Sequence, residues 1–184
     1  DEVNTFDYTV EQFADLQILR YQVHGFDELP LKQKELVYYL QEAALQGRDI
    51  LFDQNGKYNL IIRKMLETVY QDYQGDRTDS NFVNLETYLK RVWFSNGIHH
   101  HYASDKFIPG FTPEFFKAAL QSVDVSKLPL AEGETLDALC DAVFPVMFNP
   151  TVMAKRMAKI WFSLQQQTIM MVLLRKKPRI SIMP

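Results

Sequence analysis

The chain has 184 residues, of which 47% are hydrophobic and 23% are charged, the composition of a folded globular protein rather than a disordered one. A formal net charge of −3 gives no electrostatic basis for binding nucleic acid, and the single cysteine, Cys140, excludes an internal disulfide and cysteine-based zinc motifs. No apolar run approaches the roughly 20 residues that a membrane-spanning helix needs, so no membrane span is predicted.

The N-terminal part of the sequence is expected to form two helices. Thr9 to Gln12 have the spacing of a capping box, and apolar residues from Phe13 to Tyr21 then supply one face of a first helix. Pro30 suits the first turn of a second helix, in which apolar residues recur at helical spacing and which Gly47 is placed to end. A turn is predicted at residues 53–56, before the next helix.

Two further helices are predicted in the middle of the chain. The apolar positions between Tyr58 and Gln74 fit a period of about 3.6 residues, which predicts the third helix. A fourth helix begins near Ser80 and ends where Ser95-Asn96-Gly97 breaks it. Trp93 and Phe94, at the end of this helix, are expected to belong to the core.

The remaining predicted elements are also helical. After a loop or short strand that ends at Phe111, Thr112-Pro113-Glu114 provide an N-cap, a first-turn proline and a first-turn acid for a fifth helix. A sixth helix is expected from about Leu136, limited by Pro145, and Asn149-Pro150 have the chemistry to start another. The predicted fold class is therefore mainly α-helical, with at most a few short strands.

Composition changes sharply near Arg156. Residues 157–184 contain five basic residues and no acidic ones. The chain has 20 basic and 23 acidic residues, so residues 1–156 contain 15 basic and 23 acidic residues. Apolar residues after Arg156 occur in blocks, without sustained helical or alternating spacing. The sequence is therefore divided into a helical region, residues 1–156, and a basic and apolar tail, residues 157–184.

Three consecutive histidines, His99 to His101, raise the question of a metal site, because imidazole is the commonest protein ligand for zinc and copper. In a strand, His99 and His101 would share one face, and Asp105 could supply a third ligand. Two histidines are a weak signal, however, and a solvated polar turn is the simpler interpretation. We therefore predict no metal site in this chain, with His99, His101 and Asp105 as weak candidates.

Five longer runs are more specific than any short motif in the chain. They are F-A-D-L-Q-I-L-R-Y (13–21), L-K-Q-K-E-L-V-Y-Y-L (31–40), G-R-D-I-L-F-D-Q-N-G-K-Y-N-L (47–60), Y-L-K-R-V-W-F-S-N-G-I-H-H-H-Y (88–102) and L-C-D-A-V-F-P-V-M-F (139–148). Together these runs resemble the N-terminal region of bacterial dipeptidyl peptidase III, a zinc-dependent family that releases dipeptides from peptide N-termini. The likeness covers about residues 6–156.

The resemblance implies a two-lobed enzyme in which this chain belongs largely to the lobe without zinc. The zinc ligands of the family lie on H-E-x-x-G-H and E-E-x-R-A-E type motifs, and neither occurs in this sequence. In the full enzyme, zinc would polarise the scissile carbonyl and activate water. The resemblance therefore assigns no catalytic residue or zinc ligand to this chain, and only Ser95, Asn96, Gly97 and Tyr102 are candidates for contributing to the peptide cleft.

The same resemblance bears on the tail. The family continues here with a sequence similar to N-Y-Y-D-G-V-T, whereas this chain has T-I-M-M-V-L. The codons ACT ATT ATG ATG GTG TTA C encode T-I-M-M-V-L, and reading them from the third base gives Y-Y-D-G-V-T. The tail is therefore interpreted as family sequence translated out of frame in a truncated product. It is expected to add little to the fold, and its apolar residues are expected to promote self-association.

The sequence thus predicts an N-terminal fragment of a zinc-dependent dipeptidyl peptidase. It would contribute to binding the peptide substrate and is expected to be inactive alone, with no cofactor of its own. The alternative is a stand-alone helical protein-interaction module without catalysis. The compartment stays open between the bacterial cytoplasm and export with a signal peptide that has been removed.

Overall fold

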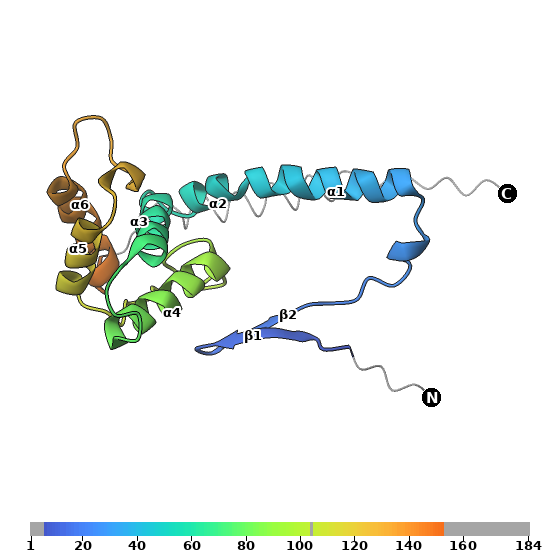
Figure 1. Cartoon of the computed structure of the whole chain (residues 1–184), viewed down its shortest axis with the longest axis horizontal. Coiled ribbons are helices and arrows are strands. Elements are labelled where there is room, and N and C mark those ends of the chain that lie inside the picture. The colour runs from blue at the N-terminus through green and yellow to red at the C-terminus, as the bar shows by residue number, and fades with distance from the viewer. Residues whose placement is uncertain (1–5, 104, 153–184) are drawn as a thin grey trace.

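The computed structural model of the chain describes residues 6–103 and 105–152 (Figure 1). A β-hairpin comes first and helices make up most of the remainder, so the predicted mainly α-helical fold is confirmed. The tail at residues 157–184, and the body of the helix predicted to start at Asn149-Pro150, lie outside the described residues.

Figure 1 shows α3 to α6 gathered into one body, while α1 extends away from it and the hairpin lies beside α4. The elements in chain order are β1 (Thr9–Phe13), β2 (Leu16–Leu19), the short 3-10 helix η1 (Phe26–Glu28), α1 (Leu31–Gln46), α2 (Arg48–Asn55), α3 (Asn59–Asp72), α4 (Ser80–Ser95), α5 (Pro113–Ser122), the 3-10 helix η2 (Val125–Lys127) and α6 (Leu136–Phe148). We call α3 to α6 the core body.

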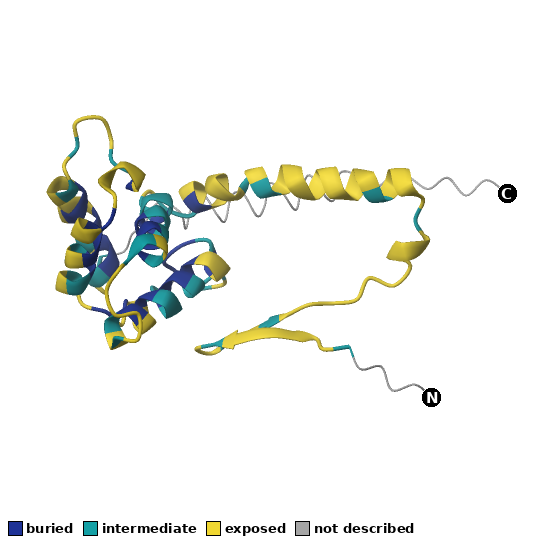
Figure 2. Cartoon of the chain, in the orientation of Figure 1, coloured by how far each residue is buried: buried dark blue, intermediate teal, exposed yellow. Residues whose placement is uncertain are grey.

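The core body holds nearly all of the buried apolar surface (Figure 2). Its fully buried side chains recur every three or four residues along each helix: Ile62, Met65, Leu66 and Val69 on α3, Leu85, Leu89 and Val92 on α4, Phe116 and Leu120 on α5, and Val143 and Met147 on α6. This spacing puts them on one face of each helix, as the sequence predicted. Among the described residues, every buried residue lies between Phe52 and Met147.

Side-chain caps fix where three of these helices begin. The Asp79 carboxylate accepts a hydrogen bond from the Asn81 N–H at 2.8 Å, and the Thr112 hydroxyl accepts one from the Phe115 N–H at 3.1 Å. Thr135 does the same for the Ala138 N–H at 3.2 Å. Each cap satisfies a backbone donor that has no partner within its own helix. The predicted start of the fifth helix at Thr112 is confirmed.

The first predicted helix is wrong, because residues 9–19 form an antiparallel hairpin. Phe13 pairs with Leu16 across the turn, and Ala14 adopts a left-handed conformation with φ of 49°. Phe13, Leu16 and Ile18 are half-buried and their neighbours are exposed, so the hairpin has one inward face. Phe13 and Leu16, three residues apart, would also lie on one face of a helix, and a window this short does not distinguish the two periods.

The second predicted helix is confirmed as α1, which begins after Pro30 and ends before Gly47. Helix α2 then starts immediately, at Arg48. The turn predicted at residues 53–56 is wrong in its first part, because residues 53–55 form the last turn of α2. Of the four residues, only Gly56 lies outside the helix. Phe52 is the one buried residue of α2, and it attaches this short helix to the core body.

Two predictions about the later helices are also wrong. Helix α6 continues past Pro145 to Phe148, so the proline lies in its last turn, where few residues follow it and the disruption that proline causes is confined to the helix end. Trp93 and Phe94 do not belong to the core, since 41% and 38% of their surfaces are exposed.

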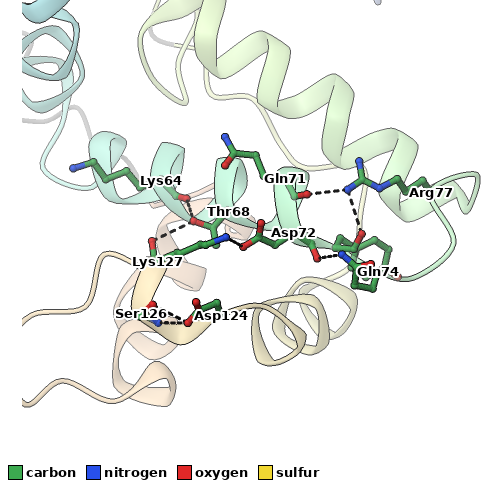
Figure 3. Close-up of polar contacts among 10 residues, drawn as sticks. Lys64, Thr68, Gln71, Asp72, Gln74, Arg77, Asp124, Ser126 and Lys127 are labelled. Carbon is green, nitrogen blue, oxygen red and sulfur yellow. Dashed lines mark hydrogen bonds and ion pairs between the residues drawn. The ribbon is translucent and has the colours of Figure 1, made fainter.

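A polar network joins the C-terminal half of α3 to η2 (Figure 3). The Lys127 ammonium donates to the Asp72 carboxylate at 2.7 Å, and the Thr68 hydroxyl lies 3.3 Å from the Lys127 carbonyl oxygen. The Arg77 guanidinium donates to the carbonyl oxygens of Gln71 and Tyr73, both at 3.2 Å. It thereby satisfies carbonyl groups at the end of α3 that lack helical partners.

Candidate functional site

Three of the four cleft candidates lie where α4 ends: Ser95 is its last residue, and Asn96 and Gly97 form the turn that follows, which is hydrogen-bonded to α2 and α3. Asn96 caps α4 in a left-handed conformation, with φ of 52°. The Asn55 side-chain amide donates to the Asn96 carbonyl oxygen at 3.1 Å, and the Asn59 Oδ1 accepts from the Ile98 N–H at 3.3 Å. These bonds connect the end of α4 to residues on α2 and α3.

Gly97 is buried in this turn because Asn59 occupies the space beside it. A Cβ atom at Gly97 would lie 2.4 Å from the Asn59 Nδ2, far inside van der Waals contact, and its φ of 154° disfavours other residues. A Cβ atom at Gly56 would meet the same Nδ2 at 2.9 Å. Asn59 itself is only 3% exposed. Gly97 thus has a packing role.

The four cleft candidates do not gather on one surface. Ser95 is buried, and its hydroxyl has no hydrogen-bond partner among the described residues, whereas 90% of the Tyr102 surface is exposed. Asn96 is partly buried and lines the pocket described below. Ser95 and Gly97 contribute to the fold at this turn, and Tyr102 and Asn96 are the two whose side chains face solvent or a cavity.

The histidine cluster lies in the loop between α4 and α5. His99 is buried, with 5% of its surface exposed, and it pairs with Lys106 in an isolated antiparallel bridge. The rings of His100 and His101 stack at a centroid distance of 4.5 Å, and the His100 Nδ1 accepts a hydrogen bond from the Tyr102 N–H. The Asp105 carbonyl oxygen accepts from the His100 N–H at 2.7 Å.

These contacts do not make a metal centre. His99 points into the protein, while Asp105 is exposed and contributes its backbone to the loop. Within residues 6–103 and 105–152, no group of three or more His, Cys, Asp or Glu side chains could hold a metal ion. His99, His101 and Asp105 therefore do not fit the three-ligand site that catalytic zinc needs.

The same loop is attached to the end of α6 by Lys106. Its ammonium group donates to the Asn149 carbonyl oxygen at 2.7 Å. Burial lowers the pKa of Lys106, because the charged ammonium loses hydration there. The contact links this loop to the C-terminal end of α6.

A cavity of mixed polarity lies between the hairpin and the helices α2 to α4. We call it the hairpin pocket, and its volume is about 540 Å³. Glu11, Phe13 and Ile18 line it from the hairpin. Arg48 and Phe52 line it from α2.

Helices α3 and α4 complete the pocket. Arg63 and Glu67 line it from α3, and Lys90, Trp93 and Phe94 line it from α4. The exposed Trp93 and Phe94 therefore have a place in the structure: they form a wall of this pocket rather than part of the core. No local sequence pattern identifies such a pocket, because its residues come from the hairpin and from three helices, α2, α3 and α4.

Salt bridges fix the hairpin over the pocket. The Lys90 ammonium lies 2.6 Å from the Glu11 Oε1 and 3.0 Å from the Glu86 Oε1. The Glu11 and Glu86 carboxylates raise the pKa of Lys90, since both favour its charged form. Arg91 forms a second ion pair with Asp15, at the hairpin turn.

Arg63 is held between two carboxylates. Its Nη2 donates to the Asp49 Oδ1 at 2.6 Å, and its Nε lies 3.4 Å from the Glu67 Oε1, an ion pair without hydrogen-bond geometry. The Arg63 hydrogen bond lowers the pKa of Asp49. The guanidinium also lies over the Phe52 ring, 4.6 Å from its centroid. The Trp93 indole N–H donates to Glu67 at 2.7 Å.

Comparison with known proteins adds no relative: no protein-family model matches the chain, and no curated protein gives a significant match. Among the described residues, none of the helices is both long and apolar enough to span a membrane.

Proposed function

We propose that this chain is the N-terminal part of a zinc-dependent dipeptidyl peptidase related to dipeptidyl peptidase III, and that it supplies structure beside the peptide cleft rather than catalysis. The likeness of the five long sequence runs between residues 13 and 148 carries this proposal. The function of the chain would then be to shape and support a cleft completed by other parts of the enzyme.

The exposure of the N-terminal elements supports a role as part of a larger protein. Helix α1 contains no buried residue. Even its leucines are open to water: Leu36 is 57% exposed and Leu40 is 61% exposed. Exposed apolar surface of this extent is typical of faces that another polypeptide covers. In the proposed enzyme, a further part of the peptidase covers α1.

Catalysis requires groups that the described residues do not bring together. Zinc hydrolases hold the metal with about three protein ligands and leave one position for water. Among the described residues, His99, His101 and Asp105 are not grouped as a set of three ligands, which supports a role without catalysis. Zinc would bind to other residues of the full enzyme, so no step of the reaction is assigned to this chain.

An activity assay tests the proposal. The purified chain should release no dipeptide from a dipeptidyl-arylamide substrate, with or without added zinc, and calorimetry should detect no tight zinc binding. Activity that survives repurification and is lost both with a chelator and in His101→Ala would contradict the proposal. His24→Ala is the matched control, because His24 lies outside the cluster.

The alternative function, a helical interaction module, is favoured by the same exposed face of α1. The nucleotide sequence across the codon for Arg156 distinguishes the two. A reading frame that continues there into H-E-x-x-G-H supports the peptidase. A continuation without that motif in any frame supports the interaction module.

A further inference from the structure

We infer that the hairpin pocket binds an organic carboxylate that carries an aromatic or large apolar group, such as the C-terminal residue of a peptide. This site is separate from zinc chemistry and does not depend on the proposed peptidase function. The inference rests on which charges in the pocket are already paired, on the walls of the pocket and on its volume.

The first step concerns the cations. Three of them line the pocket, Arg48, Arg63 and Lys90, and two already have carboxylate partners. Arg63 is paired with Asp49 and Glu67, and Lys90 with Glu11 and Glu86. Among the described residues, no ion pair or side-chain hydrogen bond engages the Arg48 guanidinium. Arg48 is therefore the cation with charge and donors left for a ligand.

The second step concerns the anions. Glu11 and Glu67 line the pocket, but Glu11 is engaged by Lys90, and Glu67 accepts the indole N–H of Trp93 and faces Arg63. A cationic ligand would find no unpaired carboxylate there. A multiply charged anion such as phosphate would meet the two carboxylates with a single unpaired cation to offset them. These charges favour a ligand with one negative charge.

The third step concerns the walls. Phe13, Phe52, Trp93 and Phe94 come from three different elements and give the pocket aromatic surface. Trp93 is 41% exposed and Phe94 is 38% exposed, so neither ring is covered by the rest of the protein. Aromatic side chains that are partly open to a pocket favour apolar and aromatic ligand groups. The apolar part of the ligand would contact these rings while its carboxylate pairs with Arg48.

The fourth step concerns size. A volume of about 540 Å³ lies within the range of roughly 300–1,000 Å³ that is usual for small-molecule sites. An arginine and a carboxylate form two parallel hydrogen bonds, which fixes the orientation of the ligand. An amino-acid-sized ligand with one carboxylate and one aromatic ring satisfies both the charge and the walls.

Trp93 provides the readout for the test. The full chain has two tryptophans, Trp93 and Trp161, so Trp161→Phe leaves Trp93 as the single indole. N-acetylphenylalanine is titrated into this protein, and its uncharged amide is titrated as the chemical control. The acid should produce a saturable change in Trp93 fluorescence, and the amide should bind about ten-fold more weakly, the effect of one charge-assisted hydrogen-bonded contact.

Two variants separate the site from nonspecific binding. Arg48→Gln should weaken binding of the acid by about ten-fold or more. Lys57→Gln removes an exposed cation that does not line the pocket, and it should leave the affinity unchanged. Circular dichroism of each variant verifies that the helices are intact. Equal binding of acid and amide, an unchanged affinity in Arg48→Gln, or no saturation at the solubility limit would overturn the inference.

A third ligand identifies the source of the carboxylate. 3-Phenylpropanoate keeps the ring and the carboxylate but lacks the amide of a peptide. Affinity equal to that of N-acetylphenylalanine indicates a site for simple aromatic acids, and weaker affinity indicates a site for peptide C-termini. Both outcomes preserve the dependence on Arg48, and dipeptide release plays no part in either measurement.

Discussion

Helix α1 has 16 residues and helix α3 has 14, and both are rich in apolar side chains, but they meet water in different ways. On α3, Ile62, Met65, Leu66 and Val69 lie on one face and are fully buried. On α1, the apolar residues 36–40 are consecutive, and none of the helix is buried. Because successive residues of a helix point about 100° apart, five in a row cover its whole circumference. Apolar content alone therefore does not decide which helix joins the core: α3 packs against α4 and α5, whereas α1 extends away from them (Figure 1).

The largest effect that would test this comparison comes from one substitution on each helix. Leu66→Ala should lower the free energy of unfolding by about 4 kcal/mol, because it removes a fully buried side chain and leaves a cavity. Leu40→Ala on α1 should change it by less than about 0.5 kcal/mol, because Leu40 is 61% exposed. Urea denaturation measures both. A loss at Leu40 similar to that at Leu66 would show that α1 is covered in solution.

The helices of the core body were predictable because their signals are local. A 3.6-residue apolar period and the caps at Asp79, Thr112 and Thr135 depend only on neighbours in the sequence. The exposure of α1 was not predictable in the same way, since burial depends on a partner that the helix itself does not encode. The hairpin was missed because Phe13 and Leu16, which pair across its turn, are three residues apart, a spacing that also fits one face of a helix.

The second prediction compares two glycines that both have positive φ, one in the core body and one in an open loop. Gly97→Ala should lower the free energy of unfolding by about 3 kcal/mol, since backbone strain adds to a 2.4 Å approach to Asn59. Gly133→Ala should cost only about 1 kcal/mol, because its φ is 76° but nothing lies within 4 Å of the new Cβ. Thermal unfolding compares them, and equal losses would contradict the packing role of Gly97.

The candidate sites were predictable from the sequence only in part. That the three adjacent histidines form no metal site stays a prediction; the structure adds that His99 is buried while the rings of His100 and His101 stack on each other. The turn at residues 95–97 was located correctly, but its packing against Asn59 was not, since the two are distant in the chain. The hairpin pocket has no sequence signal at all: Lys90 and Glu11 are 79 residues apart and meet only in the folded chain.

A third and smaller effect concerns how the exposed hairpin is attached to the core body. Lys90→Met removes the ion pair with Glu11, so amide hydrogen exchange at residues 9–19 should accelerate. The global free energy of unfolding should fall by less than about 1 kcal/mol, because both partners are partly solvated. Lys117→Met, which breaks an ion pair with Asp137 within the core body, is the control. Faster exchange at the hairpin in this control would contradict the assignment.

The smallest predicted effect lies at α2, the junction between the exposed and the buried parts of the chain. The Arg63 hydrogen bond lowers the pKa of Asp49 below its usual value of 3.8 in the folded protein. Folded Asp49 therefore binds protons less readily than unfolded Asp49. Its contribution to stability is complete above the unfolded pKa and is lost as the pH falls through the lower folded pKa.

Asp49→Asn removes this contribution. At neutral pH the variant should be less stable than the parent by no more than about 0.5 kcal/mol, because 51% of the Asp49 side chain is exposed and solvent screens the pair. The two stabilities should converge as the pH falls below 3.8, where the parent carboxylate becomes protonated. Urea denaturation across this range measures the difference.

Asp53→Asn, on the same helix and without an ion pair among the described residues, should give no such convergence. A difference in Asp49→Asn that persists unchanged at low pH, or that added salt does not reduce, would show that the Asp49 effect is not electrostatic.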